Sequence, residues 1–450
     1  MSLCTKFFLL VISLSCTNIG FVAATSTQTD QSIKKVAILG LGHVGLPTAI
    51  IAAESGYIVF GFDIDEQKIK QLNDGNTSII EPGIEARLTS ALKNNNLCIS
   101  STLHDADCFL IAVPTPVKEN NEADLSYVIN AADLIAKQIK PGNLVLLTSN
   151  IPIGTTQFIA QRIAKISQLQ PEIDFFMAHC PERAITGRLL NEIVNTDRII
   201  GGCSQQASNL AKIFYSRLTR GPIDVTTDKT AEMVKLIEDT SRYVQIAFAN
   251  QIGQICEDAQ IDTYKAIELA NKHPKVSILS PGCGVGGQGT ATAIHFLIKN
   301  FPQDSTQLLT IAHEINDGKP SLVVANIMKQ VSRFKETTGK NPSVLALGIT
   351  FRPDSEVLQS SPALKVVQQL VANQSQLHLF VFDPLAHSEE LEQLKIPFTR
   401  NLDAAIDQAD IIIALVKHKQ FISLNKNLFN KQFAFIDSCG LMHEIQKHIE

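Results

Sequence analysis

A short apolar run that leads straight into a glycine turn, KVAILGLGHVG at 35–45, sets the strongest limit on the fold. The run has the length and composition of a buried strand, and a helical pattern begins after the glycines. Similar apolar runs follow, separated by helical segments, at 57–62, 108–113, 143–149, 174–179 and 198–202. This alternation is typical of βαβ units, so we expect a parallel sheet with helices on both faces.

The same alternation returns nearer the end of the chain, after Pro320. Its apolar runs lie at 344–351, 377–383, 410–416 and 433–437. Between the two sets, residues 227–262 carry apolar residues at helical spacing behind an N-cap at 226–228, which predicts one long helix. A chain of 450 residues is too long for a single core. The predicted fold is therefore α/β, with two Rossmann-like doubly wound domains joined by a long central helix and a helical middle domain.

Residues 1–24 differ in character from the rest of the chain. Lys6 precedes the apolar run FFLLVISLS, and small residues lead up to Ala24, which is the pattern of a secretory signal peptide. A start codon placed too early, with the protein beginning near Lys34, is the alternative. The expected location is periplasmic or secreted if the signal peptide is real, and cytoplasmic if the start site is misassigned. The apolar run is too short to span a membrane, so we expect no membrane association of the mature protein.

Charge and cysteine content exclude several classes of protein. The net charge is only −5 and no dense basic run occurs, so nucleic acid is not an expected partner. The nine cysteines are scattered without metal-ligand spacing, which indicates neither a zinc site nor a disulfide framework. Cys108 and Cys256 lie in apolar contexts and are expected to be buried.

The glycine turn predicts a dinucleotide site. Gly40 permits the tight turn, Gly42 lets the backbone approach a pyrophosphate, and Gly45 permits close packing of the helix on the strand. The second strand ends in Asp63, which is placed to bind a ribose diol and would repel a 2′-phosphate. This arrangement favours NAD over NADP. A glycine turn in an unrelated α/β protein remains the alternative at this point.

Eight short segments further along the chain form a combination that is informative because of its order and spacing. They are residues 62–83, 112–116, 123–128, 151–156, 180–188, 230–239, 281–287 and 351–362. In this order and spacing they resemble the UDP-glucose/GDP-mannose dehydrogenase family. The sequence CPER at 180–183 is similar to the branch that oxidises UDP-N-acetylmannosamine or UDP-N-acetylglucosamine at C6.

The resemblance implies a three-part protein. An N-terminal NAD-binding domain is expected at 34–205, a central helical and dimerisation domain at 206–318, and a C-terminal UDP-sugar-binding domain at 319–450. A homodimer and a UDP-sugar ligand are implied as well. The family oxidises a primary alcohol to a carboxylate in two hydride transfers, through a thioester on a cysteine.

The resemblance also assigns roles to single residues. The catalytic set it implies is Lys235, which would stabilise an alkoxide, Glu182, which would assist hydrolysis, and Asp239 and Asn150, where the family has asparagine and threonine. The implied cofactor-binding residues are Gly40, Gly42, His43, Val44, Gly45, Asp63 and Thr115. Substrate binding is implied for Arg183, Lys235, Pro281, Gly282, Gly286 and Arg352. No metal is expected.

The glycine-rich segment at 279–298 departs from the family. The position of the nucleophilic cysteine is Gly289, the preceding histidine is Gln288, and the loop aspartate is Ala293. Gln359 stands where the family has an arginine. Cys283 lies six residues earlier and could replace the thiol only if the loop followed a different path.

Three readings follow from this departure. The first is an NAD-dependent UDP-N-acetylhexosamine 6-dehydrogenase for polysaccharide precursor synthesis, altered or limited to the first oxidation. The second is a non-catalytic protein that binds NAD or a nucleotide sugar. The third is a decaying gene whose product only folds.

Overall fold

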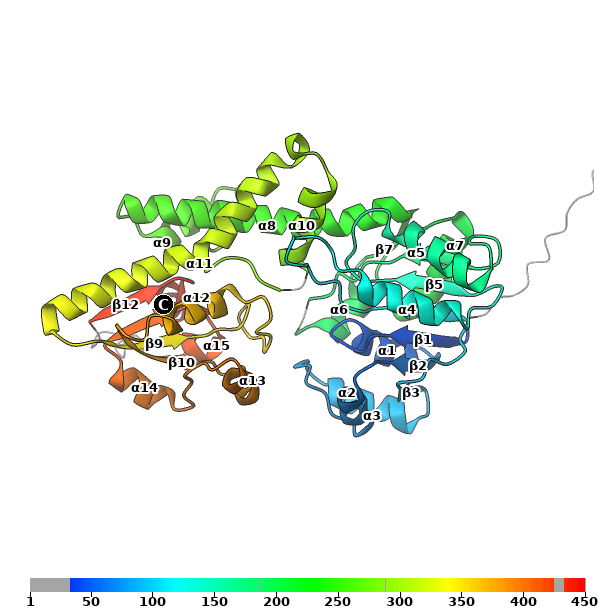
Figure 1. Ribbon diagram of the computed structural model, residues 1–450, viewed down its shortest axis with the longest axis horizontal. Helices are drawn as coiled ribbons and strands as arrows, with labels where there is room; N and C mark the ends of the chain where they lie inside the picture. Colours follow the sequence, from blue (N-terminus) through cyan, green and yellow to red (C-terminus); the bar gives the residue numbers. More distant parts are fainter. Residues whose placement is uncertain (1–32, 186, 288, 425–432, 450) are drawn as a thin grey trace, which may run out of the picture. The chain divides into compact units, whose positions relative to one another are not determined.

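The computed structural model describes residues 33–185, 187–287, 289–424 and 433–449 (Figure 1). The chain from Ile33 onward forms one compact unit. The predicted signal peptide at 1–24 and the predicted site position Gln288 lie outside the described residues.

The first sheet has eight strands in the order β3-β2-β1-β4-β5-β6-β7-β8. The strands are β1 Lys35–Leu39, β2 Ile58–Phe62, β3 Leu97–Ser100, β4 Cys108–Ile111, β5 Leu144–Leu147, β6 Phe176–His179, β7 Arg198–Gly202 and β8 Ile223–Thr227. Each of the six apolar runs expected here contains a strand, whereas β3 and β8 were not expected.

The first sheet is parallel as expected except at one pair of strands. β6 and β7 are antiparallel, with Ala178 opposite Gly202 and His179 opposite Gly201. An apolar run records burial and not direction, so the sequence pattern cannot distinguish the two pairings. The other neighbours in the sheet are parallel.

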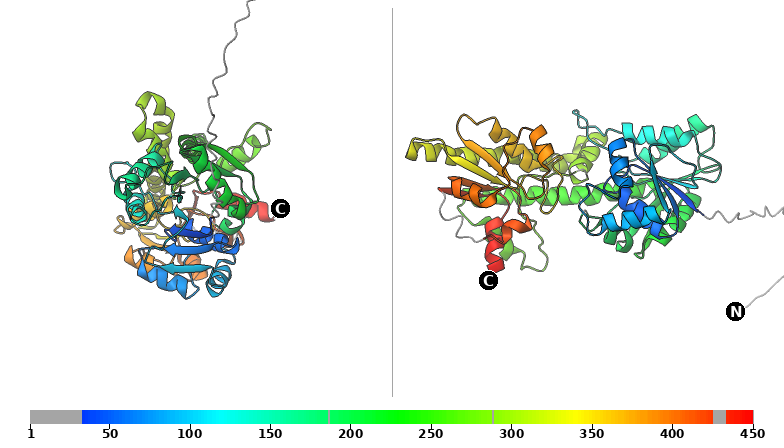
Figure 2. Two further views of the ribbon diagram at one scale, coloured as in Figure 1. Left: turned by 90° about the vertical axis from the view of Figure 1, so that its right-hand side faces the viewer. Right: turned by 90° about the horizontal axis from the view of Figure 1, so that it is seen from below.

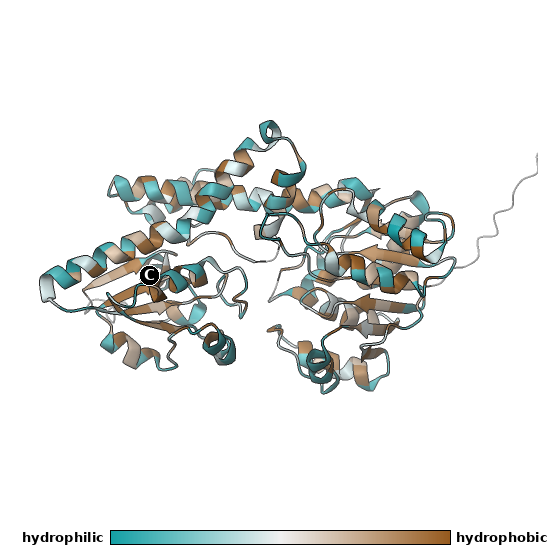
Figure 3. Ribbon diagram, in the orientation of Figure 1, coloured by the Kyte–Doolittle hydropathy of each residue, from teal (hydrophilic) through white to brown (hydrophobic). Residues whose placement is uncertain are grey.

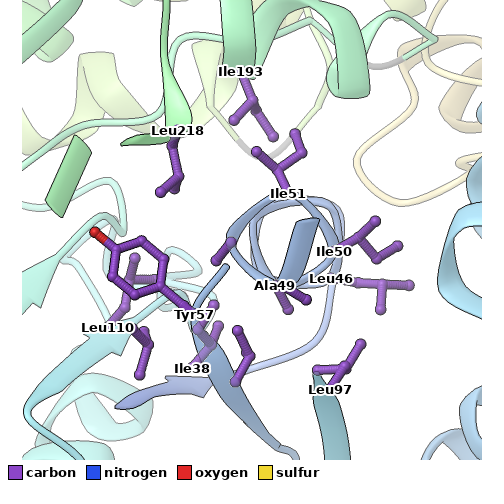
Figure 4. Packing of buried hydrophobic residues seen from close by; sticks show 14 of the residues in the cluster. Ile38, Leu46, Ala49, Ile50, Ile51, Tyr57, Leu97, Leu110, Ile193 and Leu218 are labelled. Atoms are coloured by element: carbon purple, nitrogen blue, oxygen red, sulfur yellow. The ribbon is translucent and has the colours of Figure 1, made fainter. Parts of the chain in front are cut away.

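Helices cover both faces of this sheet, as the doubly wound class requires. They are α1 Gly45–Glu54, α2 Glu66–Asn73, α3 Ile84–Lys93, α4 Ser126–Ala136, α5 Thr155–Ser167, α6 Leu189–Asn195 and α7 Gln205–Leu218. One core cluster packs around α1, where Ile193 of α6 points toward Ile51 (Figure 4). A separate cluster joins α4 and α5 to the sheet. Burial of large aliphatic side chains, worth about 1.5–3 kcal/mol each, stabilises both layers.

The second sheet is smaller and entirely parallel, in the order β10-β9-β11-β12. Its strands are β9 Ser343–Leu347, β10 His378–Phe382, β11 Ile411–Ala414 and β12 Ala434–Asp437. The flanking helices are α12 Pro362–Val371, α13 Ser388–Gln393, α14 Leu402–Gln408, α15 Lys419–Ile422 and α16 Leu441–Ile449. Two core clusters lie on its faces, so the second domain is also doubly wound. The strands of both sheets are mostly brown in Figure 3, whereas the helices carry both teal and brown residues.

The middle of the chain is helical. It contains α8 Asp228–Asp258, α9 Thr263–Ala270, α10 Thr290–Asn300 and α11 Gln303–Thr338. The long helix expected at 227–262 is α8, which begins where the Thr227 hydroxyl accepts a bond from Thr230 N–H and ends earlier than expected. It is one uninterrupted helix, and α11 packs against it (Figure 2).

The predicted boundaries at 205/206 and 318/319 both fall at or inside helices. Gln205 is the first residue of α7, and Pro320 lies within α11 rather than before the second domain. The predicted domain limits therefore stay predictions. Within the described parts of the chain, no helix is long and apolar enough to cross a membrane.

Candidate functional site

The glycine turn after β1 has no room for a side chain at Gly40 or at Gly45. Gly40 has a φ of +92°, and a Cβ there would lie 2.9 Å from the carbonyl oxygen of Ala112. A Cβ on Gly45 would lie 1.8 Å from the Gly40 oxygen, so α1 could not approach β1. Gly42 has nothing within 4 Å of its Cβ position, which leaves open space beside the turn. This is the space that a pyrophosphate group requires.

The turn lies at the point where the strand order reverses. β1 stands between β2 and β4, and in doubly wound sheets ligands bind at such a switch point. Val44 precedes the first residue of α1, and the His43 ring lies 3.3 Å from the Glu356 carboxylate. Thr115 is buried, and its hydroxyl donates to the carbonyl of Asn150. The predicted cofactor residues are thus brought to one edge of the sheet.

Asp63 follows β2 and holds the turn in place. Its Oδ2 accepts bonds from Leu41 N–H and Lys68 Nζ, both at 2.9 Å, and its Oδ1 accepts one from Asp65 N–H at 3.1 Å. Burial acts to raise the pKa of Asp63, but these bonds and the Lys68 charge outweigh burial and lower it. The carboxylate is therefore ionised at neutral pH, as binding of a ribose diol requires. Lys68 was missed from sequence, where only arginine was considered.

A second group of predicted residues meets at α8. Asp239 lies one turn beyond Lys235, and its Oδ2 is 3.4 Å from Lys235 Nζ. The same oxygen accepts a bond from Asn150 Nδ2 at 3.2 Å, and Oδ1 accepts one from the Thr290 hydroxyl at 3.4 Å. We call Lys235, Asp239, Asn150 and Thr290 the Asp239 cluster. Lys235 and Asp239 are mostly buried, with side chains 19% and 13% exposed, so their charges interact under weak solvent screening.

Gly289 faces this cluster. A Cβ at Gly289 would lie 3.3 Å from Asp239 Oδ2, so any side chain there would point at the carboxylate. Cys283 is elsewhere, because its thiol is buried in the core of the second domain and donates to the Leu415 carbonyl at 3.7 Å. Burial raises the pKa of the Cys283 thiol to about 12. Cys283 is therefore neither placed nor ionised to act as a replacement nucleophile.

The predicted hydrolytic base has buried partners. One oxygen of Glu182 pairs with Arg198 at 2.9 Å, and the other accepts bonds from the N–H groups of Arg183 and Ala184. Burial favours a higher pKa for Glu182, but the Arg198 charge and these bonds lower it. The Arg183 side chain binds Glu238 of α8 at 2.7 Å. The Glu182 carboxylate is thus part of a buried ion pair with Arg198, which also stabilises the fold.

The glycine-rich loop is held between the central helices and the second domain. Gly282 N–H donates to Asn250 of α8 at 2.9 Å, and Pro281 lies beside Gly253 of that helix. A Cβ on Gly286 would lie 2.6 Å from the Ser360 carbonyl oxygen. Arg352 stacks over the Phe351 ring at 5.4 Å. The predicted substrate residues therefore come from several elements, and Gly282 and Gly286 act through their backbones.

Comparisons with known proteins agree with this geometry. The chain matches all three domains of the UDP-glucose/GDP-mannose dehydrogenase family: the NAD binding domain over 34–219, the central domain over 229–318 and the UDP binding domain over 345–443. The chain belongs to this family. The cofactor of this family member is NAD, which the open glycine turn and the ionised Asp63 fit.

Several relatives of this family member are UDP-N-acetyl-D-mannosamine dehydrogenases. The enzyme of Campylobacter jejuni is 38% identical over 410 residues, which cover 88% of this chain and 98% of the relative. That of Escherichia coli K12 is 36% identical over 425 residues, covering 91% and 100%. The solved structure of the Pyrococcus horikoshii UDP-D-ManNAc dehydrogenase matches with a TM-score of 0.83 and 34% identity, covering 90% of this chain and 96% of that one.

Three further residues of this family member lie on the elements that form the candidate site and were missed from sequence. Glu232, one turn before Lys235, accepts bonds from Gly154 N–H at 2.6 Å and Thr156 N–H at 2.8 Å, which fixes the start of α5 against α8. Thr290 binds Asp239. His179 is fully buried, and burial, aided by the Lys235 charge, lowers its pKa to about 3. The helical spacing of Glu232 and Asp239, seven residues apart, is the signal that could have revealed Glu232.

No group of three His, Cys, Asp or Glu side chains in the described part of the chain could hold a metal ion.

Proposed function

We propose that this family member oxidises the C6 hydroxyl of a UDP-N-acetylhexosamine to the aldehyde with NAD, in the synthesis of a polysaccharide precursor, and stops there. The Asp239 cluster carries the proposal, because it places an ammonium and a carboxylate where the glycine loop ends. The loop position that would need a thiol is Gly289. The relatives named above support UDP-N-acetylmannosamine as the first substrate to test.

The cluster provides what a two-electron oxidation needs from the protein. The alcohol loses a proton to the Asp239 carboxylate, and Lys235 Nζ stabilises the alkoxide as the proton leaves. NAD held at the glycine turn and Asp63 would supply the hydride acceptor for the same carbon, so that the oxidation balances as an aldehyde, NADH and one proton. Asn150 and Thr290 fix the direction of the carboxylate through their bonds to its two oxygens. A carboxylate is a weak base towards an alcohol, so the proton transfer is unfavourable and we expect slow turnover.

The second oxidation lacks its covalent step in this proposal. A thiolate is needed to hold the aldehyde as a thiohemiacetal and then to form the thioester. Gly289 has no side chain, Ala293 is buried in an apolar cluster with Leu236, and Cys283 is buried elsewhere. Losing a catalytic nucleophile commonly costs several orders of magnitude in rate.

The alternative function is that of a non-catalytic protein that binds NAD and a nucleotide sugar. The same position, Gly289, favours it, together with the unfavourable charge of Asp239 beside Lys235. We also propose that the protein is a homodimer through α8. Exposed apolar side chains on that helix, Ile237, Phe248 and Ile255, support this assembly.

Counting NADH per sugar separates the two functions. Purified protein is given UDP-N-acetylmannosamine, UDP-N-acetylglucosamine or UDP-glucose with NAD, and NADH is followed by absorbance. One NADH per sugar, with an aldehyde trapped by hydroxylamine, is the expected result. Two NADH per sugar would show that the full oxidation proceeds without a thiol at position 289. No NADH, with NAD binding seen by calorimetry, would favour the binding protein.

A restored loop provides a sharper test. Gly289→Cys alone would bring a thiol within contact distance of Asp239, whose negative charge disfavours the thiolate. We therefore expect only the triple variant Gly289→Cys, Ala293→Asp, Asp239→Asn to reach two NADH per sugar. Gly289→Ser with the other two changes is the matched control, because a hydroxyl is a much weaker nucleophile. A triple variant that still releases one NADH would mean that more than the loop is altered.

A further inference from the structure

Two of the characteristic sequence segments end at a cavity that lies apart from the Asp239 cluster. Glu81 and Pro82 come from the segment at 62–83, and Gly187 and Arg188 come from the segment at 180–188. They line a cavity of about 470 Å³ between the start of α3 and α6. None of the residues assigned above to cofactor, substrate or catalysis lines it. These two segments thus meet at a place that the proposed reaction does not use.

Arginines give the cavity a positive character. Arg87, Arg188 and Arg220 line it, and an adjoining cavity of about 310 Å³ shares Arg87 and Arg220 and adds Arg217. Arg87 is neutralised, because its Nε donates to Glu54 at 2.8 Å and its Nη2 contacts the other oxygen of that carboxylate. Among the described residues, neither Arg188 nor Arg220 forms an ion pair. Two guanidinium groups are therefore available to an anion.

A buried carboxylate adds a second kind of contact. Glu81 is 8% exposed, and its Oε1 accepts a bond from Leu190 N–H at 3.3 Å. Its Oε2 is buried and has no hydrogen-bond partner. A buried acceptor without a partner is costly, and a hydroxyl or amide donor from a ligand would satisfy it. The cavity thus combines two arginines that can bind an anion with a carboxylate oxygen that can accept a hydrogen bond from the ligand.

We propose that this cavity binds a sugar phosphate. Its phosphate group would lie on Arg188 and Arg220, and a sugar hydroxyl would donate to Glu81 Oε2. The volume suits a ligand of this size, since sites for small molecules generally span about 300–1,000 Å³. The site is separate from the proposed catalytic function and does not rest on it.

Calorimetric titration of the full chain with glucose 1-phosphate tests the proposal. We expect saturable binding, with inorganic phosphate weaker and glucose weaker still, because each supplies only one of the two contacts. Arg188→Ala and Arg220→Ala should each weaken glucose 1-phosphate by about tenfold or more, the loss of a charge-assisted hydrogen bond. Both side chains are exposed, so these variants should fold. Glu81→Gln should weaken glucose 1-phosphate and leave inorganic phosphate unchanged.

Two control variants separate the cavity from general charge and from the catalytic cluster. Lys212→Ala removes one exposed positive charge from α7 outside the cavity, and Lys235→Ala disrupts the Asp239 cluster. Both should bind glucose 1-phosphate as the unchanged protein does. The proposal is overturned if the unchanged protein does not bind glucose 1-phosphate, or if Lys212→Ala costs as much as Arg220→Ala. It is also overturned if Lys235→Ala abolishes binding, or if inorganic phosphate binds as tightly as glucose 1-phosphate.

Discussion

The two Rossmann-like domains contain the same turn followed by the same acid. Gly40 and Gly348 both have positive φ, at +92° and +79°, and both N–H groups donate to the last residue of the neighbouring strand. An aspartate comes next in each domain, Asp63 after β2 and Asp383 after β10. Each aspartate accepts a bond from the residue after its glycine, at 2.9 Å and 2.7 Å.

The surroundings of the two acids are different. The partner of Asp63 is Lys68, whose side chain is 39% exposed, whereas Asp383 is paired with His418, and both are at most 1% exposed. The His418 ring accepts a bond from Asp354 N–H through Nδ1, so Nε2 carries the proton and donates to Asp383. A ligand can displace an exposed lysine but not a buried histidine. We therefore propose that the same local motif serves a cofactor site in the first domain and supports the structure in the second.

The largest expected difference is in stability. Asp383→Ala removes the acceptor of four backbone N–H groups and of His418, so we expect a loss of about 3–5 kcal/mol in unfolding free energy. Asp63→Ala should cost clearly less, because Lys68 can turn to water. Urea unfolding followed by circular dichroism, with hydrogen exchange of β9 and β10, measures this. Equal losses in the two variants would contradict the comparison.

For NAD affinity, unlike stability, we expect the larger effect at Asp63. Asp63→Ala removes the acceptor for the ribose diol, and we expect the NAD dissociation constant to rise by roughly 10–100-fold. Asp63→Asn is the milder control, because it keeps an oxygen acceptor without the charge. Calorimetry with NAD gives the values. An unchanged affinity in Asp63→Ala would mean that the ribose lies elsewhere.

Acid should weaken the second domain through Asp383. Burial acts to raise the pKa of Asp383, but the His418 bond and the backbone N–H groups lower it in the folded protein. A lowered folded pKa adds stability above the unfolded pKa of about 3.9, and this is lost as pH falls through the folded pKa. Hydrogen exchange of β9 and β10 should therefore accelerate below about pH 4. A mild His418→Asn variant that keeps the fold should show a weaker acid dependence.

The smallest expected effect is that of removing Lys68, the partly exposed partner of Asp63. Lys68→Ala removes a half-exposed ion pair, which is worth about 0–1 kcal/mol, and NAD affinity should change by less than about threefold. His418→Ala in the second domain should cost several times more stability. Thermal unfolding and NAD titration of both variants give this comparison. A large loss in Lys68→Ala would mean that Asp63 needs its partner as much as Asp383 does.

Much of the fold could be read from local pattern. The six apolar runs of the first domain, the four of the second and the long helix α8 have lengths and periods that identify buried strands and an amphipathic helix. The strands β3 and β8 were missed because polar residues interrupt their apolar runs, as in LCIS of β3 and IDVTT of β8. The direction of β7 was missed because burial does not encode direction. Pro320 was taken as a break, but tertiary contacts hold it within α11.

The sequence predicted many residues of the candidate site, but it did not predict most of the contacts between them. Lys235 and Asp239 share a helix face by their spacing alone, so their pairing followed from the sequence. The approach of Asn150 and Gly289 to that pair could not, because 89 and 50 residues separate them from Asp239 along the chain. The spacing of Glu232 from Asp239 also places it on that helix face, but its contacts with Gly154 and Thr156 depend on how α5 packs against α8.

The sequence alone determined the α/β class, the glycine turn, the family and the glycine at position 289, because these depend on local spacing and on residue identity. Tertiary structure alone decided that Cys283 is buried away from Asp239 and that Glu182 is tied to Arg198. It also decided that the partner of Asp383, His418, is enclosed, whereas the partner of Asp63, Lys68, is partly exposed. It also brought two distant segments together at the arginine-lined cavity. The physical reason is that burial and charge pairing depend on which elements pack together, and neighbours along the chain do not specify that packing.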